Sequence, residues 1–236
     1  MVALTFVGMA VSDRYLAGRE STQVGEVRRL TLDDGSALSL NTDSVVQVKY
    51  AQDERRIVLR EGEASFQVRH DEHRPFLVQA DDVFVRAVGT AFTVRKRATG
   101  VEVTVSEGVV EVMRGGKSER INAERVSRNQ ELIVPVTVTQ QRIAVAALSE
   151  SEVSRRLSWQ EGRLVFQGER LADAVAEVNR YSMTPVVIDD GALGARSFVG
   201  VFRIGDSRSF AQAAAAAFDG RVREENGALH LQAASR

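Results

Sequence analysis

The sequence has no cysteine, no excess of charge of either sign and no long apolar segment, and each absence removes a class of protein. Without cysteine among its 236 residues, a disulfide scaffold, a cysteine-based zinc site and a thiol nucleophile are all excluded. The 31 lysines and arginines against 32 aspartates and glutamates leave a net charge of −1, without the basic excess of a nucleic-acid-binding face. Neither a G-x-S-x-G nucleophile elbow nor a glycine-rich phosphate loop occurs. We therefore expect no enzymatic turnover, no cofactor and no nucleic-acid partner.

The apolar segment near the N-terminus, VALTFVGMAV at residues 2–11, is about half as long as a membrane-spanning helix. It also lacks the basic region and the small-residue cleavage site of a signal peptide. Two interpretations stay open: a first strand or buried arm, or the outer half of a transmembrane helix.

Residues 24–140 contain short strand-like segments and no helical pattern. Segments such as RRIVLRE (55–61) and VEVTVSE (101–107) alternate apolar with polar residues or cluster strand-forming residues, and turn residues separate them. This pattern predicts a mainly-β roll or sandwich, or a short β-solenoid-like domain. The alternation also predicts that the arginine, lysine and glutamate positions of these strands face water.

Glu-Gly precedes a strand-like segment three times, at 61–62, 107–108 and 161–162. Gly62 and Gly108 would each let the next strand begin at a sharp angle, which a Cβ atom would hinder. We interpret these pairs as architecture and assign no chemistry to their carboxylates.

The pattern changes near residue 160. Residues 141–158 are polar and weakly helical, and we interpret them as a linker that Trp159 anchors onto the following module. The remaining segments predict strands and two helices in the order βαβ-βαββ, which describes a small α+β domain. The predicted division is an N-terminal arm or membrane-helix end (1–23), an all-β domain (24–140), the linker (141–158) and the α+β domain (159–236).

Two amphipathic helices are expected in this second module, at 169–182 and 207–218, with Asp206 as N-cap of the second. Their expected core residues are Leu171, Ala174, Val175, Val178 and Tyr181, and Phe210, Ala213, Ala214, Ala217 and Phe218.

The cluster His70-Asp71-Glu72-His73 has the side chains of a metal site but lies between two strands. We interpret it as a solvated loop and expect no metal.

One strand of the second module, at 197–204, is the candidate surface for a partner. If it lies at a sheet edge, it could accept a partner strand by β-augmentation, although its phenylalanines are better explained by core packing. The residues concerned are Phe198, Val199, Val201 and Phe202.

Several motifs together resemble the FecR family of periplasmic sigma-factor regulators. They include DGSALSLNTDS (34–44), EGEASFQV (61–68) and GTAFTV (89–94). The segment that begins WQEGRLVF at Trp159 resembles that family's C-terminal module, which is similar to the secretin and TonB N-terminal signalling domain. The resemblance extends from about residue 24 to 232.

The resemblance implies a regulator anchored in the inner membrane, with this chain in the periplasm. The signalling domain of a TonB-dependent outer-membrane receptor, loaded with a ferric siderophore, would touch it. A periplasmic protease would then help to free a cytoplasmic segment that modulates an extracytoplasmic-function sigma factor. That cytoplasmic segment is not in this sequence, and residues 2–11 would be the outer end of the membrane helix. The alternative is a structural adaptor of an envelope secretion complex.

In some FecR-like proteins the chain cleaves itself at a Gly-Thr dipeptide in this setting, by an N→O acyl shift. The resemblance therefore makes Gly89 and Thr90 a candidate self-cleavage site. The alternative is that Gly89 is a strand bend and Thr90 an ordinary strand residue.

Overall fold

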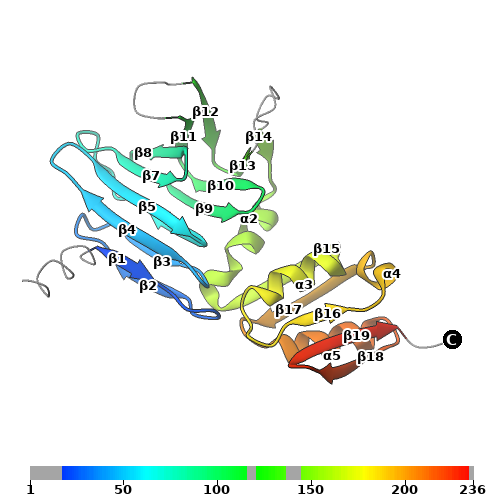
Figure 1. Cartoon of the computed structure of the whole chain (residues 1–236). Helices are drawn as coiled ribbons and strands as arrows, with labels where there is room; N and C mark the ends of the chain where they lie inside the picture. Colours follow the sequence, from blue (N-terminus) through cyan, green and yellow to red (C-terminus); the bar gives the residue numbers. More distant parts are fainter. Residues whose placement is uncertain (1–17, 116–120, 137–144, 234–236) are drawn as a thin grey trace, which may run out of the picture.

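The computed structural model describes residues 18–115, 121–136 and 145–233 (Figure 1). The apolar segment 2–11 lies outside these residues, so its assignment stays a prediction. Among the described residues, no helix has both the length and the apolar character needed to cross a membrane.

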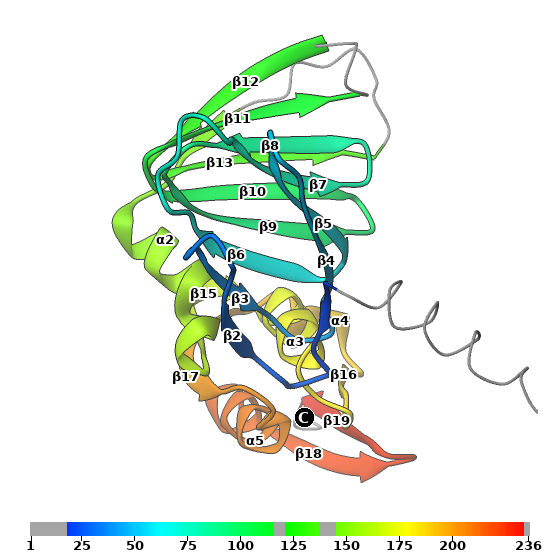
Figure 2. The ribbon, with the colours of Figure 1, turned by 90° about the vertical axis from the view of Figure 1, so that its left-hand side faces the viewer.

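The N-terminal half, which we define as strands β1 to β14, consists of two seven-stranded sheets. The first sheet has the order β1 (Arg19–Ser21), β4 (Val45–Tyr50), β5 (Arg55–Glu61), β7 (Phe76–Ala80), β8 (Val83–Ala87), β11 (Val109–Arg114) and β12 (Ile121–Ser127). The second has the order β14 (Val145–Ala147), β13 (Gln130–Pro135), β10 (Gly100–Glu107), β9 (Ala91–Arg97), β6 (Glu63–Gln67), β3 (Ala37–Leu40) and β2 (Arg28–Thr31). Figure 2 shows most of these strands one above another. The mainly-β prediction is confirmed.

A single apolar core lies between the two sheets. In β5 and β9 the inward residues, such as Ile57, Leu59, Phe92 and Val94, are almost fully buried. Pairing is antiparallel except between β5 and β7, which run parallel. Two-residue alternation thus places one face of each strand on the core.

The Glu-Gly turns have the conformation that the sequence suggests. Gly62 lies between β5 and β6 with φ +77°, and a Cβ atom there would come within 2.6 Å of the Asp43 carbonyl oxygen. Gly108, between β10 and β11, also has φ +77°. Both positions therefore require glycine for backbone reasons.

The described part of the segment expected to be a linker contains regular secondary structure. β14 pairs with β13, and the helix α2 (Glu150–Leu157) leads into a short 3-10 helix, η1 (Ser158–Glu161). Ser149 caps α2 in a reciprocal capping box with Glu152. In Figure 1, α2 lies between the β-sheets and the last third of the chain.

The C-terminal half, which we define as α2 to β19, ends in the expected βαβ-βαββ order. Its elements are β15 (Arg163–Arg170), α3 (Leu171–Asn179), β16 (Val186–Ile188), the short α4 (Gly191–Gly194), β17 (Ser197–Arg203), α5 (Ser207–Ala217), β18 (Gly220–Glu225) and β19 (Ala228–Ala233). β15 pairs with β17, while β16, β19 and β18 form a second small sheet. The helices α3 and α5 touch each other and pack on these strands.

The two expected helix stripes have different outcomes. All five expected residues of α3 are buried, as predicted. In α5 the prediction is partly wrong, because Ala217 is exposed and Ala211 and Ala215 are buried instead. Because five consecutive residues of this helix are alanine, the sequence has no apolar–polar contrast that shows which side of the helix is buried. Asp206 is the N-cap, as expected, and accepts a hydrogen bond from the Ser209 amide.

Candidate functional site at the junction of the two halves

The outer face of the second large sheet carries rows of polar side chains. Across neighbouring strands, Arg95 of β9 is flanked by Glu63 of β6 and Glu102 of β10. Their alternation predicts a water-facing surface, and for this patch that prediction is wrong. The side chains of Glu63 and Arg95 are only 7% and 14% exposed, because the C-terminal half covers them. The charged outer face of one half is therefore the contact surface for the other.

Four alternating charges close into a ring across this contact. The N-terminal half contributes Glu63 and Arg95, and the end of α3 contributes Glu177 and Arg180. Arg95 Nη2 lies 2.8 Å from Glu177 Oε2, and Arg180 Nη1 lies 2.6 Å from Glu177 Oε1. Arg180 Nη2 lies 2.9 Å from Glu63 Oε2, and Arg95 Nε lies 3.8 Å from that same oxygen. Each carboxylate of this charge ring thus has an arginine on both sides, which offsets the cost of its burial.

Further hydrogen bonds, most of them between uncharged groups, fix the same contact. The amide nitrogen of Asn41 donates to the Tyr181 hydroxyl at 2.8 Å and to Glu63 at 3.0 Å. The Thr42 hydroxyl donates to the Arg180 carbonyl at 3.0 Å and accepts from the Gly25 amide at 2.8 Å. Asn41, Thr42 and Tyr181 are at most 2% exposed. These buried bonds give the junction directional geometry as well as charge pairing.

The arginines of the ring favour the ionised state of Glu177. Burial alone would raise the pKa of Glu177, but the charges of Arg180 and Arg95 hold it below the ordinary value. Burial raises the pKa of the Tyr181 phenol, with the Glu177 charge adding to the effect. Glu177 therefore stays ionised at neutral pH, and the Tyr181 phenol stays neutral.

A second set of contacts joins α2 and η1 to the same sheet. Arg156 Nη2 donates to Glu131 Oε2 at 2.9 Å, and Nε lies 2.9 Å from Oε1 as an ion-pair contact. The Gln160 amide donates to Ser65 at 3.1 Å. Arg155 instead pairs with Glu169 of β15, within the C-terminal half.

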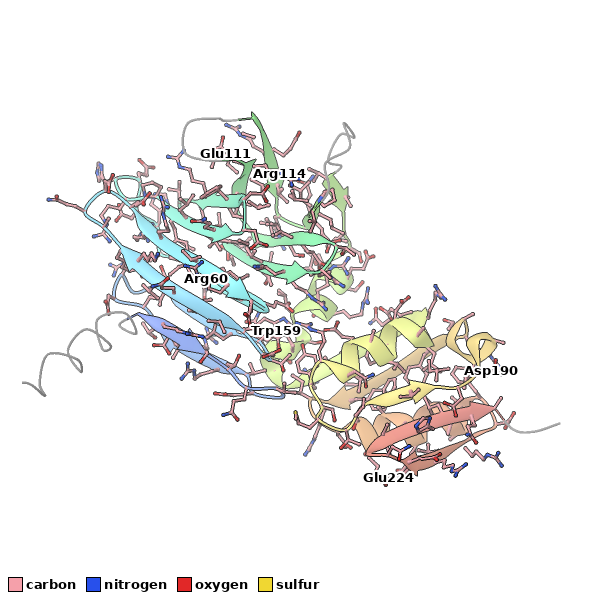
Figure 3. The ribbon with its side chains drawn as sticks, viewed as in Figure 1. Arg60, Glu111, Arg114, Trp159, Asp190 and Glu224 are labelled. Atoms are coloured by element: carbon pink, nitrogen blue, oxygen red, sulfur yellow. The ribbon has the colours of Figure 1, made fainter. Side chains whose placement is uncertain are left out.

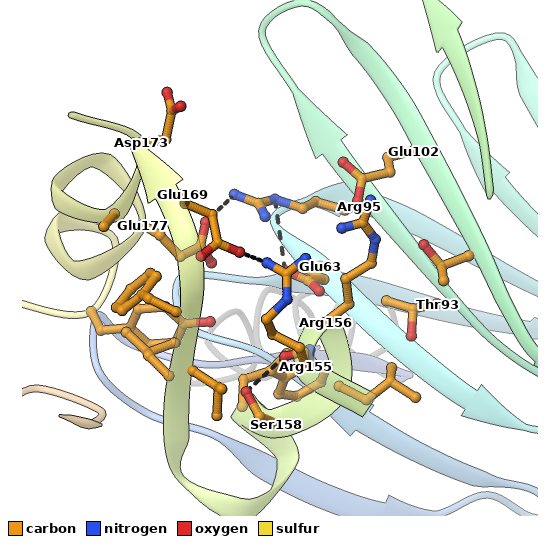
Figure 4. A pocket seen from close by; sticks show the side chains of 18 of the residues that line it. Glu63, Thr93, Arg95, Glu102, Arg155, Arg156, Ser158, Glu169, Asp173 and Glu177 are labelled. Atoms are coloured by element: carbon orange, nitrogen blue, oxygen red, sulfur yellow. Dashed lines mark hydrogen bonds and ion pairs between the residues drawn. The ribbon is translucent and has the colours of Figure 1, made fainter. Parts of the chain in front are cut away.

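Between these contacts lies a cavity of about 220 Å³ (Figure 4). Its walls come from β9 and β10 on one side and from α2, η1, β15 and α3 on the other. Figure 3 places Trp159 at this junction, and the indole belongs to the second apolar core at 3% exposure. The expected anchoring role of Trp159 agrees with this position.

The predicted partner strand is β17, and its four candidate residues divide between two environments. Phe198 is 2% exposed and stacks on Phe202 and against Phe210 inside the second core. Val199 and Val201 point outward and are 72% and 59% exposed. In the described part of the chain, β17 pairs with β15 alone. Only the two valines are therefore available to a partner.

The Gly89-Thr90 pair lies between β8 and β9. Thr90 is 7% exposed, and its hydroxyl has no hydrogen-bond partner among the described residues. A Cβ atom at Gly89 would lie 2.7 Å from Nδ1 of His70, and one at Gly108 would lie 3.2 Å from the Gly89 carbonyl oxygen. Gly89 itself is exposed, with the His70 imidazole on one side and the Gly108 turn on the other.

The loop that holds His70 and His73 is exposed, with His70 Nε2 3.5 Å from a Glu72 carboxylate oxygen. Within the described ranges, no group of three or more potential metal ligands comes together.

Sequence reasoning did not single out the charge ring. Glu177 and Arg180 stand on the expected helix of residues 169–182, but their partners lie 82 and 117 residues away. The only local signal was a row of charges on strands that could as well face solvent. A candidate could have been found only by pairing that row with the charged end of a helix.

The comparisons with known proteins agree with this architecture. Residues 18–111 match the model of the family described as FecR protein. The match covers residues 18–111, and we refer to this FecR-like segment as the FecR domain. Two crystal structures of a "putative anti-sigma factor" from Parabacteroides distasonis ATCC 8503 have the same fold, each with 24% identity over 92% of this chain and 99% of that chain. Their TM-scores are 0.73 and 0.72. No curated protein matches the chain.

The FecR domain runs from the residue before β1 into β11 and so includes Asn41, Thr42, Glu63 and Arg95. The likeness to the two crystal structures extends through both halves. The similarity of the C-terminal half to secretin and TonB-receptor modules stays a prediction.

Proposed function

We propose that this chain is the signal-receiving part of a FecR-type transmembrane regulator. It lies in the periplasm and relays the state of a ferric-siderophore receptor to an extracytoplasmic-function sigma factor, through a cytoplasmic segment. The observation that carries the proposal is the FecR domain at residues 18–111. The relative of the same fold, described as an anti-sigma factor, supports a sigma factor as the final target.

The proposed docking surface is the free edge of β17. An edge strand offers unpaired backbone groups to an incoming strand, and exposed valines beside it add apolar contact. Val199 and Val201 provide that contact without belonging to the core. The occupant we assign to it is a strand of the signalling domain of a TonB-dependent receptor.

The charge ring is the proposed relay. β17 lies in the C-terminal half, and Glu177 and Arg180 of the charge ring hold that half against the N-terminal half. A partner that displaces β17 would therefore have to break the ion pairs of the ring. If the receptor domain binds better when the two halves are separated, it shifts the population toward that separated form. In that form the surface of the FecR domain at the junction is exposed to a periplasmic protease.

The test is binding between this chain and purified receptor signalling domains, measured by calorimetry. Val199→Glu combined with Val201→Glu should weaken binding at least tenfold, because two charges would be buried against the partner strand. Val109→Glu, at an exposed valine of β11, is the matched control and should bind normally. Binding to a secretin ring and to no receptor domain would overturn the proposal in favour of the secretion adaptor.

A second candidate activity is self-cleavage at Gly89-Thr90, which the buried Thr90 hydroxyl without a hydrogen-bond partner among the described residues and the nearby His70 ring support. The Thr90 hydroxyl would attack the Gly89 carbonyl carbon, while His70 accepts the hydroxyl proton and passes it to the leaving nitrogen of Thr90. The C–N bond breaks as an ester forms, and water then hydrolyses the ester to a Gly89 carboxylate and restores the hydroxyl.

A denaturing gel of the purified chain tests this activity. Two fragments are expected, lost in Thr90→Ala and slowed in His70→Gln, with His73→Gln of the same exposed loop as control. A single full-length band after prolonged incubation would contradict self-cleavage and leave the signalling proposal unaffected.

A further inference from the structure

Besides Nε of Arg156, which lies 2.9 Å from Glu131 Oε1, three buried hydrogen-bond donors on residues that line the junction cavity have no hydrogen-bond partner among the described residues. They are the Thr93 hydroxyl, Arg155 Nε and the Trp159 indole nitrogen. Thr93 and Trp159 are 6% and 3% exposed. A buried polar group without a partner costs about 1–3 kcal/mol, so several of them around one cavity are unusual unless something binds there.

These groups come from both halves of the molecule. Thr93 lies on the outer face of β9, opposite Ser65 and Thr104 of the neighbouring strands. Arg155 lies in the last turn of α2, and Trp159 lies in η1. An occupant that satisfied all three would therefore touch the FecR domain and the C-terminal half at once.

The occupant has to supply acceptors, because the carboxylates near these donors are already engaged. Glu102 pairs with Arg97 at 2.7 Å, Glu131 with Arg156 and Glu169 with Arg155. In Figure 4, Arg155 and Arg156 lie close together, while Asp173 stands at the margin of the view. Burial lowers the pKa of Arg155, and the adjacent charge of Arg156 lowers it further. A further negative charge beside these two arginines, in addition to Glu169 and Glu131, would raise that pKa again.

We propose that this cavity binds a small oxyanion, a phosphate or a carboxylate, that bridges the two halves. At roughly 30 Å³ for each water, 220 Å³ holds about seven waters, which is room for phosphate or for a compact acid such as citrate. The bound anion would accept from Thr93, Arg155 and Trp159 and would strengthen the closed junction. This inference does not depend on the receptor or on the sigma factor.

Trp159 is the only tryptophan in the chain, so its fluorescence reports directly on the cavity. The full chain is titrated with inorganic phosphate, with citrate and with sodium chloride at matched ionic strength. A saturable fluorescence change with phosphate or citrate, and none with chloride, is expected. The anion that saturates at the lower concentration identifies the source of the oxyanion as phosphate-bearing or carboxylate-bearing.

Two variants assign any signal to the cavity. Thr93→Val keeps the shape of the side chain and removes its hydroxyl, and Arg155→Gln removes the cation; each should weaken binding about tenfold. Their controls are Thr31→Val, on an exposed strand position, and Arg208→Gln, at an exposed arginine of α5. If Arg155→Gln fails to fold, Thr93→Val alone decides.

Two results would overturn the proposal. One is a flat titration of the native chain with both anions, which would mean that the cavity holds water only. The other is an equal response of the native chain and Thr93→Val, which would place the anion elsewhere. Neither result bears on receptor binding, which is measured separately on the β17 edge.

Discussion

Single residues at this junction act through the backbone as well as through charge. Gly62 ends β5 and starts β6, so it sets where Glu63 emerges from the sheet. Its conformation leaves no room for a side chain, because a Cβ atom would meet Ser44 and the Asp43 carbonyl. The position of one carboxylate of the charge ring therefore depends on a neighbouring glycine.

Gly62→Ala should destabilise the protein by about 2–4 kcal/mol, from the left-handed conformation and from the backbone clash. Gly162→Ala is the matched control, because Gly162 has φ +73° but nothing within 4 Å of a Cβ atom. Its cost should be only about 1 kcal/mol. Urea unfolding of both variants measures the difference, and equal losses would show that the clash relaxes without cost.

Glu177 is the ring member whose removal is most informative, because it pairs with one arginine from each half. Glu177→Gln should lower the free energy of unfolding by about 1–3 kcal/mol, since Arg95 and Arg180 lose their shared partner while remaining largely buried. Glu224→Gln, at the exposed pair with Arg208, should change it by less than about 0.5 kcal/mol. A similar effect of both variants in urea unfolding would show that the ring contributes no more than a surface pair.

The same carboxylate predicts a pH dependence. The pKa of Glu177 in the folded chain is below its ordinary value of 4.5, so the unfolded chain takes up a proton first as pH falls. The contribution of Glu177 is therefore complete above about pH 4.5 and is lost as pH falls through the folded pKa. The stability difference between the native chain and Glu177→Gln should shrink from about pH 6 to about pH 3. A constant difference over that range would contradict the assignment.

At the scale of helices and strands, an element can be predicted from the sequence when its apolar and polar residues are clearly patterned. Strands such as β10, which alternates clearly, and β5, which has an apolar cluster between charged residues, begin and end close to their expected residues. The helix α2 was missed because Ser, Arg and Glu dominate it, and one buried valine, Val153, is too little for a stripe. β14 has three residues and exists only because β13 offers it an edge.

The capping box is the local signal that could have identified α2. Ser149 accepts from the Glu152 amide, and the Glu152 carboxylate accepts from the Ser149 amide at 2.7 Å. Ser149→Ala should cost about 1 kcal/mol. Without this cap the helix should open more often, so amide hydrogen exchange should also become faster along α2, the helix that carries Arg155 and Arg156. Ser154→Ala, exposed within the helix, should leave both measurements near those of the native chain.

At the scale of the whole molecule, the sequence specifies two cores but not how they meet. The residues of each core are close in sequence and follow their own periodicity, so both were largely predictable. The junction joins residues such as Asn41 and Tyr181, which are 140 positions apart and show no local pattern. The charges on β6 and β9 were assigned to solvent because alternation alone cannot say what covers a polar face.

Because polar contacts form much of the junction, the two halves should unfold together only while the charge ring is intact. Trp159 reports on the second core, whereas far-ultraviolet circular dichroism is dominated by the strands of the first. In the native chain the two signals should give one melting transition. In the double variant Glu63→Gln and Glu177→Gln, the charge ring loses both of its carboxylates, and the two midpoints should separate by several degrees. Arg208→Gln should keep a single transition. Coincident midpoints in the double variant would mean that apolar contacts such as Val27 against the second core hold the halves together without the ring.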